Sequence, residues 1–592
     1  MTNQTCCPLS RRVENLLLLV CVGLAAVIPL HNGWYKWPDA YVDFGGEAYG
    51  AWRVLAGDLP QRDIASTFGP LSGYFNAATF AIFGSSLGTL YFVNGALYLL
   101  LVFSLFSILR RFTSFPAALL ACTWVTAALA FNQLVSIGNY NFIAPYAHAV
   151  THGLVLASAA LLLTVKMLEA PNARWLGAAA GATFGAAALT KPEIFLALLL
   201  ALSVLLSLRH RDWTRRNRWL FLAGTLSLPA GFCLFFRIRC DWRLGADNLL
   251  LPFSTLLGEL RHYNVGQLRL YQYIMGTDDL GRRLSNSLDS FCLIVGVSAL
   301  AWFAERHLSG RFDSRSTSWL ARVSAGTVGF LAMYFAPMFF QLPSATPLVL
   351  ALAVAYFVWA WRKQGNREAA VALAMGILGG GILLKTLFNV RYEHYGFAVN
   401  FVAFVFLLAT AWDGSRAYGL LLRPLLLGSV LAVAIKLPVH AHQDFWRHKT
   451  EVVQSGHDKL LTYAGDRSLA DTVNMVLKRV PPDATLSVWP EGIIINYLAR
   501  RRTSVRDTVL LPFTFSVRGE ETPLAEFKAS PPDFVILRNR DVWEFGKTGF
   551  GIDYAKPLFA WLEANYVKRD QYGVVPFSQN QVGMILYERA GR

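Results

Sequence analysis

Residues 41–71 read YVDFGGEAYGAWRVLAGDLPQRDIASTFGPL and directly follow the first long apolar segment of the chain. Only 16% of the protein's residues are charged. This stretch and the residue just upstream nevertheless gather five acids: Asp39, Asp43, Glu47, Asp58 and Asp63. Asp43 and Glu47 are four residues apart, so a helix through them would carry both carboxylates on one face. We expect a short helix over residues 47–55, with Gly57 at its C-terminal cap.

The composition around this stretch is that of a membrane protein. Of 592 residues, 54% are hydrophobic and 14% aromatic, and the mean hydropathy is +0.39. A soluble enzyme would carry about 25% charged residues. The net charge of +16 does not indicate a nucleic-acid partner, because Lys and Arg gather in short clusters between apolar runs. That arrangement orients helices in a bilayer. The sequence therefore predicts a polytopic α-helical protein whose partner is the lipid bilayer.

The apolar runs predict about thirteen transmembrane helices, since roughly 17–25 residues cross a membrane. They lie near residues 13–31, 88–109, 114–132, 148–167, 174–190, 192–208, 219–236, 287–305, 322–340, 346–361, 369–388, 397–412 and 418–436. The basic clusters alternate with these runs and place the N-terminus in the cytoplasm. We interpret the first run as an uncleaved span. The first loop (32–87) and the second large loop (237–286) are then external.

The final part of the chain changes character. Residues 1–437 are interpreted as the transmembrane domain, and residues 438–592 as a small soluble α/β domain on the external, periplasmic side. ATLSVW, DFVILRN and QVGMILYER are typical of strands, and SLADTVNMVLKRV of an amphipathic helix. We thus expect a multi-pass protein of the inner (plasma) membrane.

The order of motifs in the first loop resembles the GT-C superfamily of membrane glycosyltransferases. An acid after the first span (Asp43), Tyr49, the Gly-x-x-Pro segment GDLP and the FGPL before an apolar helix carry the resemblance. Protein O-mannosyltransferases and aminoarabinose transferases belong to this superfamily and use polyprenyl-phosphate sugars. The resemblance implies a GT-C-like fold and an inverting hexosyl- or pentosyltransferase. Its donor would be a polyprenyl-phosphate-linked sugar, and its acceptor a lipid, glycan or protein at the external face.

The same resemblance maps the superfamily's catalytic acid onto Asp43. Sugar transfer from a phosphate needs a base for the acceptor hydroxyl and cations for the departing phosphate. Glu47 and Asp63 are second candidates, for the base, for the acceptor or for a divalent cation (Mg²⁺ or Mn²⁺). Alternatively, the acids of this loop are caps and ion-pair partners of Arg53 and Arg62. FGPL departs from the Lys-Pro-Pro-Leu of many members, so contacts of that lysine do not carry over.

Candidate substrate and phosphate ligands lie at the predicted external ends of other spans. Lys191 sits in LTKPEIF, where a simple ion pair with Glu193 is the alternative. An Arg followed by a Tyr in KTLFNVRYEHYGFAVN is similar to the late loop that faces the lipid phosphate in the superfamily. The full set of candidates is Lys191, Arg391, His394, Tyr395, Arg237, Arg261 and Tyr140.

Two other functions fit part of the sequence. A transporter or flippase of a lipid-linked substrate would carry internal repeats and ionisable groups at mid-membrane. We see no repeat, and the charges gather at external ends. An enzyme like an O-antigen polymerase or ligase would have a large external loop but usually no C-terminal globular domain.

Overall fold

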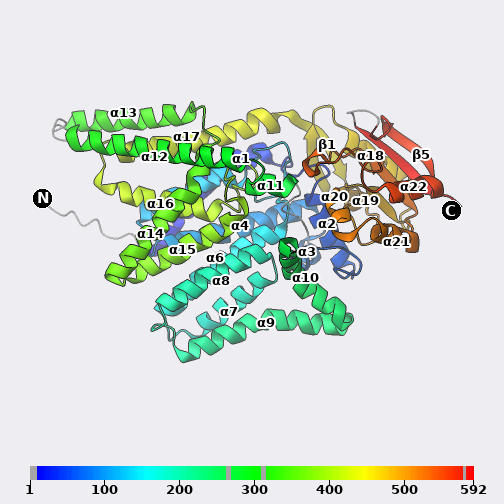
Figure 1. Cartoon of the computed structure of the whole chain (residues 1–592), viewed down its shortest axis with the longest axis horizontal. Coiled ribbons are helices and arrows are strands. Elements are labelled where there is room, and N and C mark those ends of the chain that lie inside the picture. The colour runs from blue at the N-terminus through cyan, green and yellow to red at the C-terminus, as the bar shows by residue number, and fades with distance from the viewer. Residues whose placement is uncertain (1–9, 262–268, 309–314, 578–581, 592) are drawn as a thin grey trace.

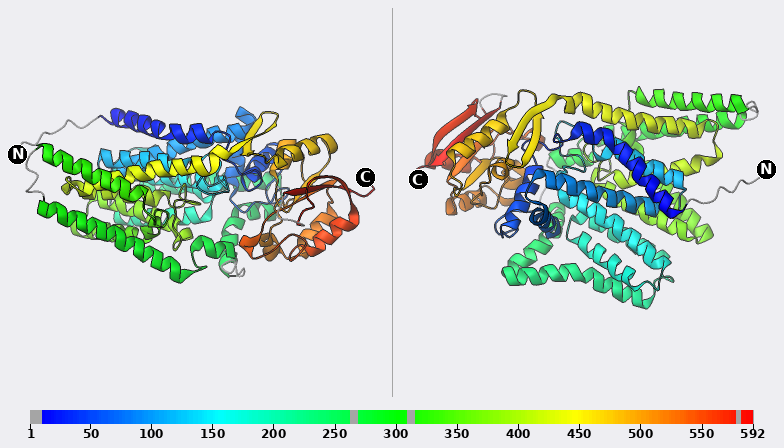
Figure 2. Two further views of the ribbon diagram at one scale, coloured as in Figure 1. Left: turned by 90° about the horizontal axis from the view of Figure 1, so that it is seen from above. Right: turned by 180° about the vertical axis from the view of Figure 1, so that it is seen from behind.

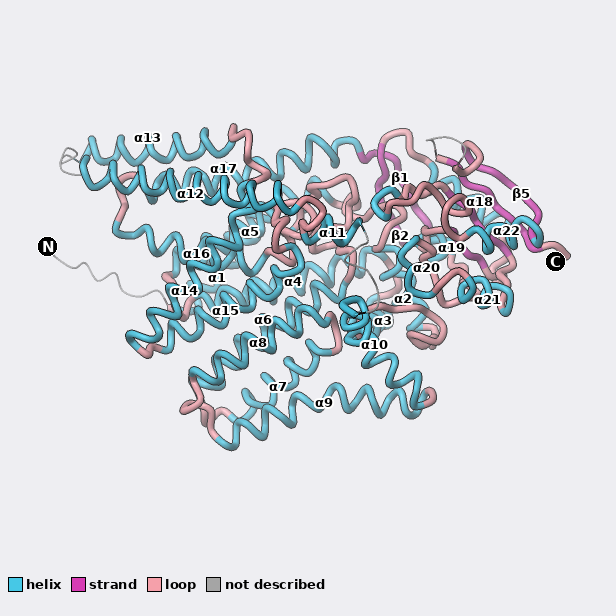
Figure 3. The backbone as a smooth tube through the Cα atoms, in the orientation of Figure 1, coloured by secondary structure: helices cyan, strands magenta, loops and turns pink. Residues whose placement is uncertain are grey.

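The structure is a computed structural model that describes residues 10–261, 269–308, 315–577 and 582–591. Long helices occupy one end of the molecule, and the strands are confined to the other end (Figures 1 and 3). The short helices α2 and α3 of the first external loop lie between the two parts (Figure 1).

The helical part confirms the polytopic helical fold. A helix lies at each of the thirteen predicted segments in the described chain: α1 (Arg11–Gly33), α4 (Leu87–Leu109), α5 (Phe115–Val125), α6 (His148–Glu169), α7 (Arg174–Ala188), α8 (Pro192–Leu208), α9 (Arg215–Arg239), α12 (Leu280–Leu308), α13 (Arg315–Tyr334), α14 (Thr346–Gln364), α15 (Arg367–Leu383), α16 (Phe401–Gly414) and α17 (Leu422–His440). Among the described residues, eight helical segments are long and apolar enough to cross a membrane. The count of thirteen spans therefore stays a prediction.

Both large loops that the sequence predicts to be external contain helices. α2 (Phe44–Leu55) begins three residues earlier than predicted and ends at the predicted residue. Gly57, just beyond it, has φ +101°, a backbone conformation that favours glycine. α3 (Pro70–Phe83) completes the first loop. In the second loop, α10 (Trp242–Arg261) and α11 (Arg269–Met275) lie between α9 and α12. That loop is therefore shorter than predicted, because the flanking helices extend into it.

The C-terminal part contains two sheets. β1 (Lys449–Ser455) and β2 (Asp458–Tyr463) form an antiparallel hairpin. The second sheet has the order β3-β4-β6-β5, in which only β3 and β4 are parallel. Its strands are β3 (Leu486–Trp489), β4 (Phe534–Arg538), β5 (Tyr566–Gly573) and β6 (Gly583–Arg589). The helices are α18 (Ser468–Arg479), α19 (Ile494–Ala499), α20 (Pro512–Arg518), α21 (Glu521–Ala529) and α22 (Lys556–Asn565). All three predicted strands and the predicted helix are present.

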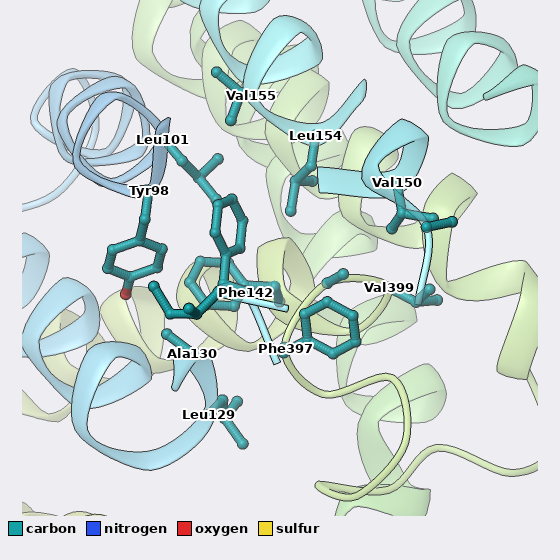
Figure 4. Packing of buried hydrophobic residues seen from close by; sticks show 14 of the residues in the cluster. Tyr98, Leu101, Leu129, Ala130, Phe142, Val150, Leu154, Val155, Phe397 and Val399 are labelled. Atoms are coloured by element: carbon teal, nitrogen blue, oxygen red, sulfur yellow. The ribbon is translucent and has the colours of Figure 1, made fainter. Parts of the chain in front are cut away.

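A buried apolar core fixes the two loops that carry the candidate tyrosines. Tyr98 of α4 and Leu154 of α6 pack around Phe142 and Phe397 (Figure 4). Tyr98 is also held by a hydrogen bond between its Oη and Thr126 Oγ1, 2.7 Å apart. Phe142 and Phe397 each lie two residues from a candidate site tyrosine, so this packing positions the site above it.

The C-terminal domain docks on the first external loop, as Figure 2 shows from two further sides. Gly45 at the start of α2 lies so close to α19 that an added Cβ would be 2.5 Å from Ile494 Cβ. Tyr49 Oη accepts a hydrogen bond of 2.9 Å from the backbone N–H of Thr503. The two domains therefore meet beside Asp43.

Candidate active site

Asp43 directly precedes α2, with φ +56° and ψ −71°. Non-glycine residues rarely adopt a positive φ, and such strain is concentrated at functional sites. The side chain does not cap the helix. Asp43 is accessible to solvent, yet burial is the main cause that raises its pKa to about 8. The negative charges of Glu491 and Asp39 raise the pKa further, and Arg540 opposes them. A substrate could therefore reach the Asp43 carboxyl, although neighbouring protein atoms raise its pKa.

Glu47 joins the first loop to the start of α6. Its Oε1 accepts a hydrogen bond of 3.0 Å from the backbone N–H of His148, and Oε2 lies 3.5 Å from His148 Nδ1. A carboxylate at a helix N-terminus is favoured by the helix dipole. Burial raises the pKa of Glu47 to about 7, while the His148 N–H and the charge of Lys191 act in the other direction. Its hydrogen bonds show that Glu47 caps α6.

Asp63 is used within its own loop. Its Oδ2 accepts a hydrogen bond of 2.8 Å from the backbone N–H of Leu59 and pairs with Arg62 Nη2 at 2.7 Å. Asp58 pairs in the same way with Arg53, at 2.7 Å. These contacts match the alternative drawn from the sequence, in which acids of this loop cap turns and pair with Arg53 and Arg62.

Two lysines share one carboxylate on the other side of the site. Lys191 Nζ lies 3.3 Å from Glu193 Oε1, so the predicted ion pair is present. Lys385 Nζ lies 3.8 Å from the same oxygen. Both ammonium groups face the ring of Tyr146, at 5.4 Å and 5.6 Å from its centroid. Glu193 alone does not neutralise both ammonium groups, and the charge of Lys191 also acts on Glu47.

The FGPL motif positions Lys191. Gly69 N–H donates to the carbonyl of Thr190 at 2.8 Å, and Leu71 N–H to that of Leu189 at 3.1 Å. An added Cβ on Gly69 would be 2.3 Å from the oxygen of Leu189, so only glycine fits. Lys191 Nζ then lies 4.6 Å from the ring centroid of Phe68. The motif that lacks a lysine thus has one brought alongside it from the α7–α8 turn.

Arg391 lies at the centre of a polar and aromatic cluster. Its Nη1 donates to Tyr273 Oη at 2.8 Å, and its Nη2 lies 3.3 Å from His394 Nδ1. Burial, with the charge of Arg391, lowers the His394 pKa to about 3, so this imidazole is neutral and can accept. The guanidinium of Arg283 also faces the ring of Tyr273, 5.5 Å from its centroid.

Arg391, Tyr273 and His394 line a cavity of about 60 Å³. Its walls are Tyr140, Leu270, Tyr273, Ile274, Thr386, Asn389, Arg391, Glu393, His394, Tyr395 and Asn400. Arg391 Nε is buried without a hydrogen-bond partner among the described residues. Arg391 thus keeps hydrogen-bonding capacity for a ligand.

Tyrosines connect the acidic and the cationic sides. The rings of Tyr140 and Tyr395 are 5.5 Å apart, and Tyr140 packs on His394 at 4.6 Å. Burial raises the pKa of both phenols, and the negative charge of Asp43 contributes to both shifts. Lys385 Nζ lies 5.0 Å from the Tyr395 centroid. Asp43 and the cations therefore lie around one group of tyrosine rings.

The remaining candidates lie outside this cluster. Arg237 is exposed in the last turn of α9, and the side chain of Arg261, at the end of α10, lies outside the described part of the structure. Within the described ranges, no three His, Cys, Asp or Glu side chains are grouped so that they could hold a metal ion.

Comparisons with known proteins show what the chain resembles in fold and in part of its sequence. The family described as dolichyl-phosphate-mannose-protein mannosyltransferase matches residues 67–233. The archaeal oligosaccharyltransferase AglB from Archaeoglobus fulgidus superposes with a TM-score of 0.51 at 14% identity, over 98% of this chain and 74% of that one. The chain therefore shares a GT-C-like fold with this oligosaccharyltransferase. ArnT from Cupriavidus metallidurans aligns at 14% identity and a TM-score of 0.42, over 96% and 97% of the two chains. Comparison with curated protein sequences finds no match.

Seven of the residues proposed from the sequence lie near one another in the structure: Asp43, Glu47, Lys191, Tyr140, Arg391, His394 and Tyr395. The sequence prediction did not single out Arg283 or Tyr273, because nothing in a helix end or a surface loop distinguishes them before folding. Glu491 lies in VWPEG, one proline after a predicted strand. A buried-strand pattern followed closely by an acid was the available signal.

Proposed function

We propose that this GT-C protein transfers a sugar from a polyprenyl-phosphate-linked donor to a hydroxyl of a lipid, glycan or protein acceptor, at the external face of the membrane. The observation that carries the proposal is the arrangement of the site. One solvent-accessible carboxylate, Asp43, and a set of cations, Lys191, Lys385 and Arg391, lie around the same tyrosines. The carboxylate can accept a proton from an acceptor hydroxyl, and the cations can stabilise the charge of a phosphate.

The reaction is a single displacement with inversion at the anomeric carbon. Asp43 takes the proton of the acceptor hydroxyl as the acceptor oxygen bonds to the anomeric carbon. The bond from that carbon to the phosphate oxygen breaks, and the phosphate leaves with a second negative charge. Arg391 and Lys385 stabilise that charge, Arg391 through a planar set of N–H donors. Donor and acceptor become glycosylated acceptor and polyprenyl phosphate, and Asp43 releases its proton to solvent.

The known proteins support this donor class. The matching family is described by dolichyl-phosphate-mannose and a protein acceptor. The AglB structure contains an inhibitory peptide and a dolichol-phosphate. We therefore place the lipid phosphate of the donor at the cavity beside Arg391, and the acceptor beside Asp43.

The test uses purified protein in lipid, a panel of polyprenyl-phosphate sugars and membrane extract as acceptor. Release of polyprenyl phosphate from one donor, only with acceptor present, is the expected result. If labelled donor instead crosses the bilayer unconsumed, the protein is a transporter or flippase. Assays with EDTA and with added Mg²⁺ or Mn²⁺ establish any metal requirement; no step above uses a metal.

A further inference from the structure

The loop after β3 carries a buried ion pair next to the first external loop. Glu491 is only 4% exposed, and its Oε2 lies 2.7 Å from Arg540 Nε. Arg540 Nη2 lies 2.8 Å from Glu544. A buried ion pair is weak evidence for stability, because desolvation offsets the attraction. The position of this pair therefore calls for another explanation.

Contacts on both sides of Asp43 place it opposite Glu491. Two residues before Asp43, the ring of Tyr41 lies 3.8 Å from the guanidinium of Arg538. Arg538 in turn donates to the backbone carbonyl of Glu491 at 3.0 Å. Two residues after Asp43, Gly45 abuts Ile494, which lies three residues beyond Glu491. The Asp43 and Glu491 loops are thus fixed against each other at two points.

We propose that Glu491, held by Arg540, is a positioning residue with which the C-terminal domain sets the pH range where Asp43 can act as a base. The inference rests on the proposed function. It assigns the soluble domain a part in the site, through an acid that does not itself touch the reacting atoms.

The charges around Asp43 fix the sign of the effect. Glu491, Asp39 and Glu47 are negative, Arg540 is positive, and Tyr140 and Tyr395 are neutral. Next to burial, Glu491 contributes most to the raised pKa of Asp43. Removing the charge of Glu491 lowers that pKa, and the unpaired Arg540 adds to the effect. Removing Arg540 leaves Glu491 uncompensated and raises it.

The experiment measures kcat/KM for polyprenyl-phosphate release against pH in full-length protein. Glu491→Gln should move the acid limb to lower pH, and Arg540→Gln to higher pH, each by on the order of one pH unit. Glu491→Asp should return the limb toward wild type. Glu588→Gln is the matched control, since Glu588 forms an exposed ion pair with Arg569, at 2.6 Å, in the same domain, and it should leave the limb in place.

A structural role alone would lower the plateau without moving the limb. An unmoved limb in active Glu491→Gln protein, or shifts of one sign in Glu491→Gln and Arg540→Gln, would overturn the inference. If Glu491→Gln does not fold, the sign of the Arg540→Gln shift decides. Should the wild type release no polyprenyl phosphate at any pH, the proposed function itself fails, which is a different outcome.

Discussion

Arg391 engages two acceptors with one planar group, Tyr273 Oη and His394 Nδ1. Lysine keeps the charge but cannot hold both contacts and a phosphate in this geometry. We predict that Arg391→Lys raises KM for the donor and lowers kcat/KM by about 10- to 100-fold. Steady-state kinetics with the preferred donor measure both. Arg282→Lys, an exposed arginine at the start of α12, is the control and should behave as wild type; equal losses in both variants would remove Arg391 from the phosphate site.

The sequence alone identifies a site residue when both its position in a local pattern and the chemistry of its side chain indicate a site. Asp43 follows a span and precedes a helix, and Lys191 and Arg391 stand where basic residues are otherwise avoided. Arg283 and Glu491 are different, because their roles depend on distant parts of the chain. Arg283 contacts Asn389, more than one hundred residues away. Glu491 acts on Asp43, more than four hundred residues away. Such pairings exist only after folding.

Gly69 of FGPL packs closely against the α7–α8 turn, which carries Lys191. Gly69 has no room for a Cβ beside Leu189. Gly73, one turn into α3, has nothing within 4 Å. We predict that Gly69→Ala separates FGPL from the α7–α8 turn, displaces Lys191 and raises KM for the donor at least tenfold, with about 1–3 kcal/mol lost in stability.

Gly73→Ala is the matched variant. It should leave turnover unchanged and stabilise α3 by up to about 1 kcal/mol, since alanine is the better helix former. Thermal unfolding and donor titration distinguish the two variants. A Gly69→Ala protein with wild-type KM would contradict the positioning of Lys191 by FGPL.

Helices were predictable because hydropathy and length determine them, and the thirteen segments confirm it. The boundaries of the helices in the two large loops were less predictable. α2 starts at Phe44 because its first turn packs on α19, and the tail that supplies α19 cannot be read from the loop. The second large loop is shorter than predicted because α9 and α12 extend into it, and it contains α10 and α11.

The whole molecule places the site where the helical part meets the C-terminal domain. The proposed reaction at the external face therefore needs that domain outside the cytoplasm. In a variant without its seven native cysteines, we predict that Lys528→Cys, exposed on α21, reacts with an impermeant maleimide in intact cells. Arg12→Cys, exposed at the start of α1, should react only after permeabilisation. The reverse pattern would invert the topology and move the reaction to the cytoplasmic face.

The measurement that tests the account most directly compares Asp43→Asn with Asp58→Asn in the polyprenyl-phosphate release assay. Both change an acid of the first loop, but Asp58 pairs with Arg53, while Asp43 is accessible to solvent and has a raised pKa. We predict that Asp43→Asn keeps donor binding and loses turnover by about 10²–10⁴-fold, while Asp58→Asn retains it. Turnover by Asp43→Asn equal to that of Asp58→Asn would contradict the assignment of Asp43 as the base.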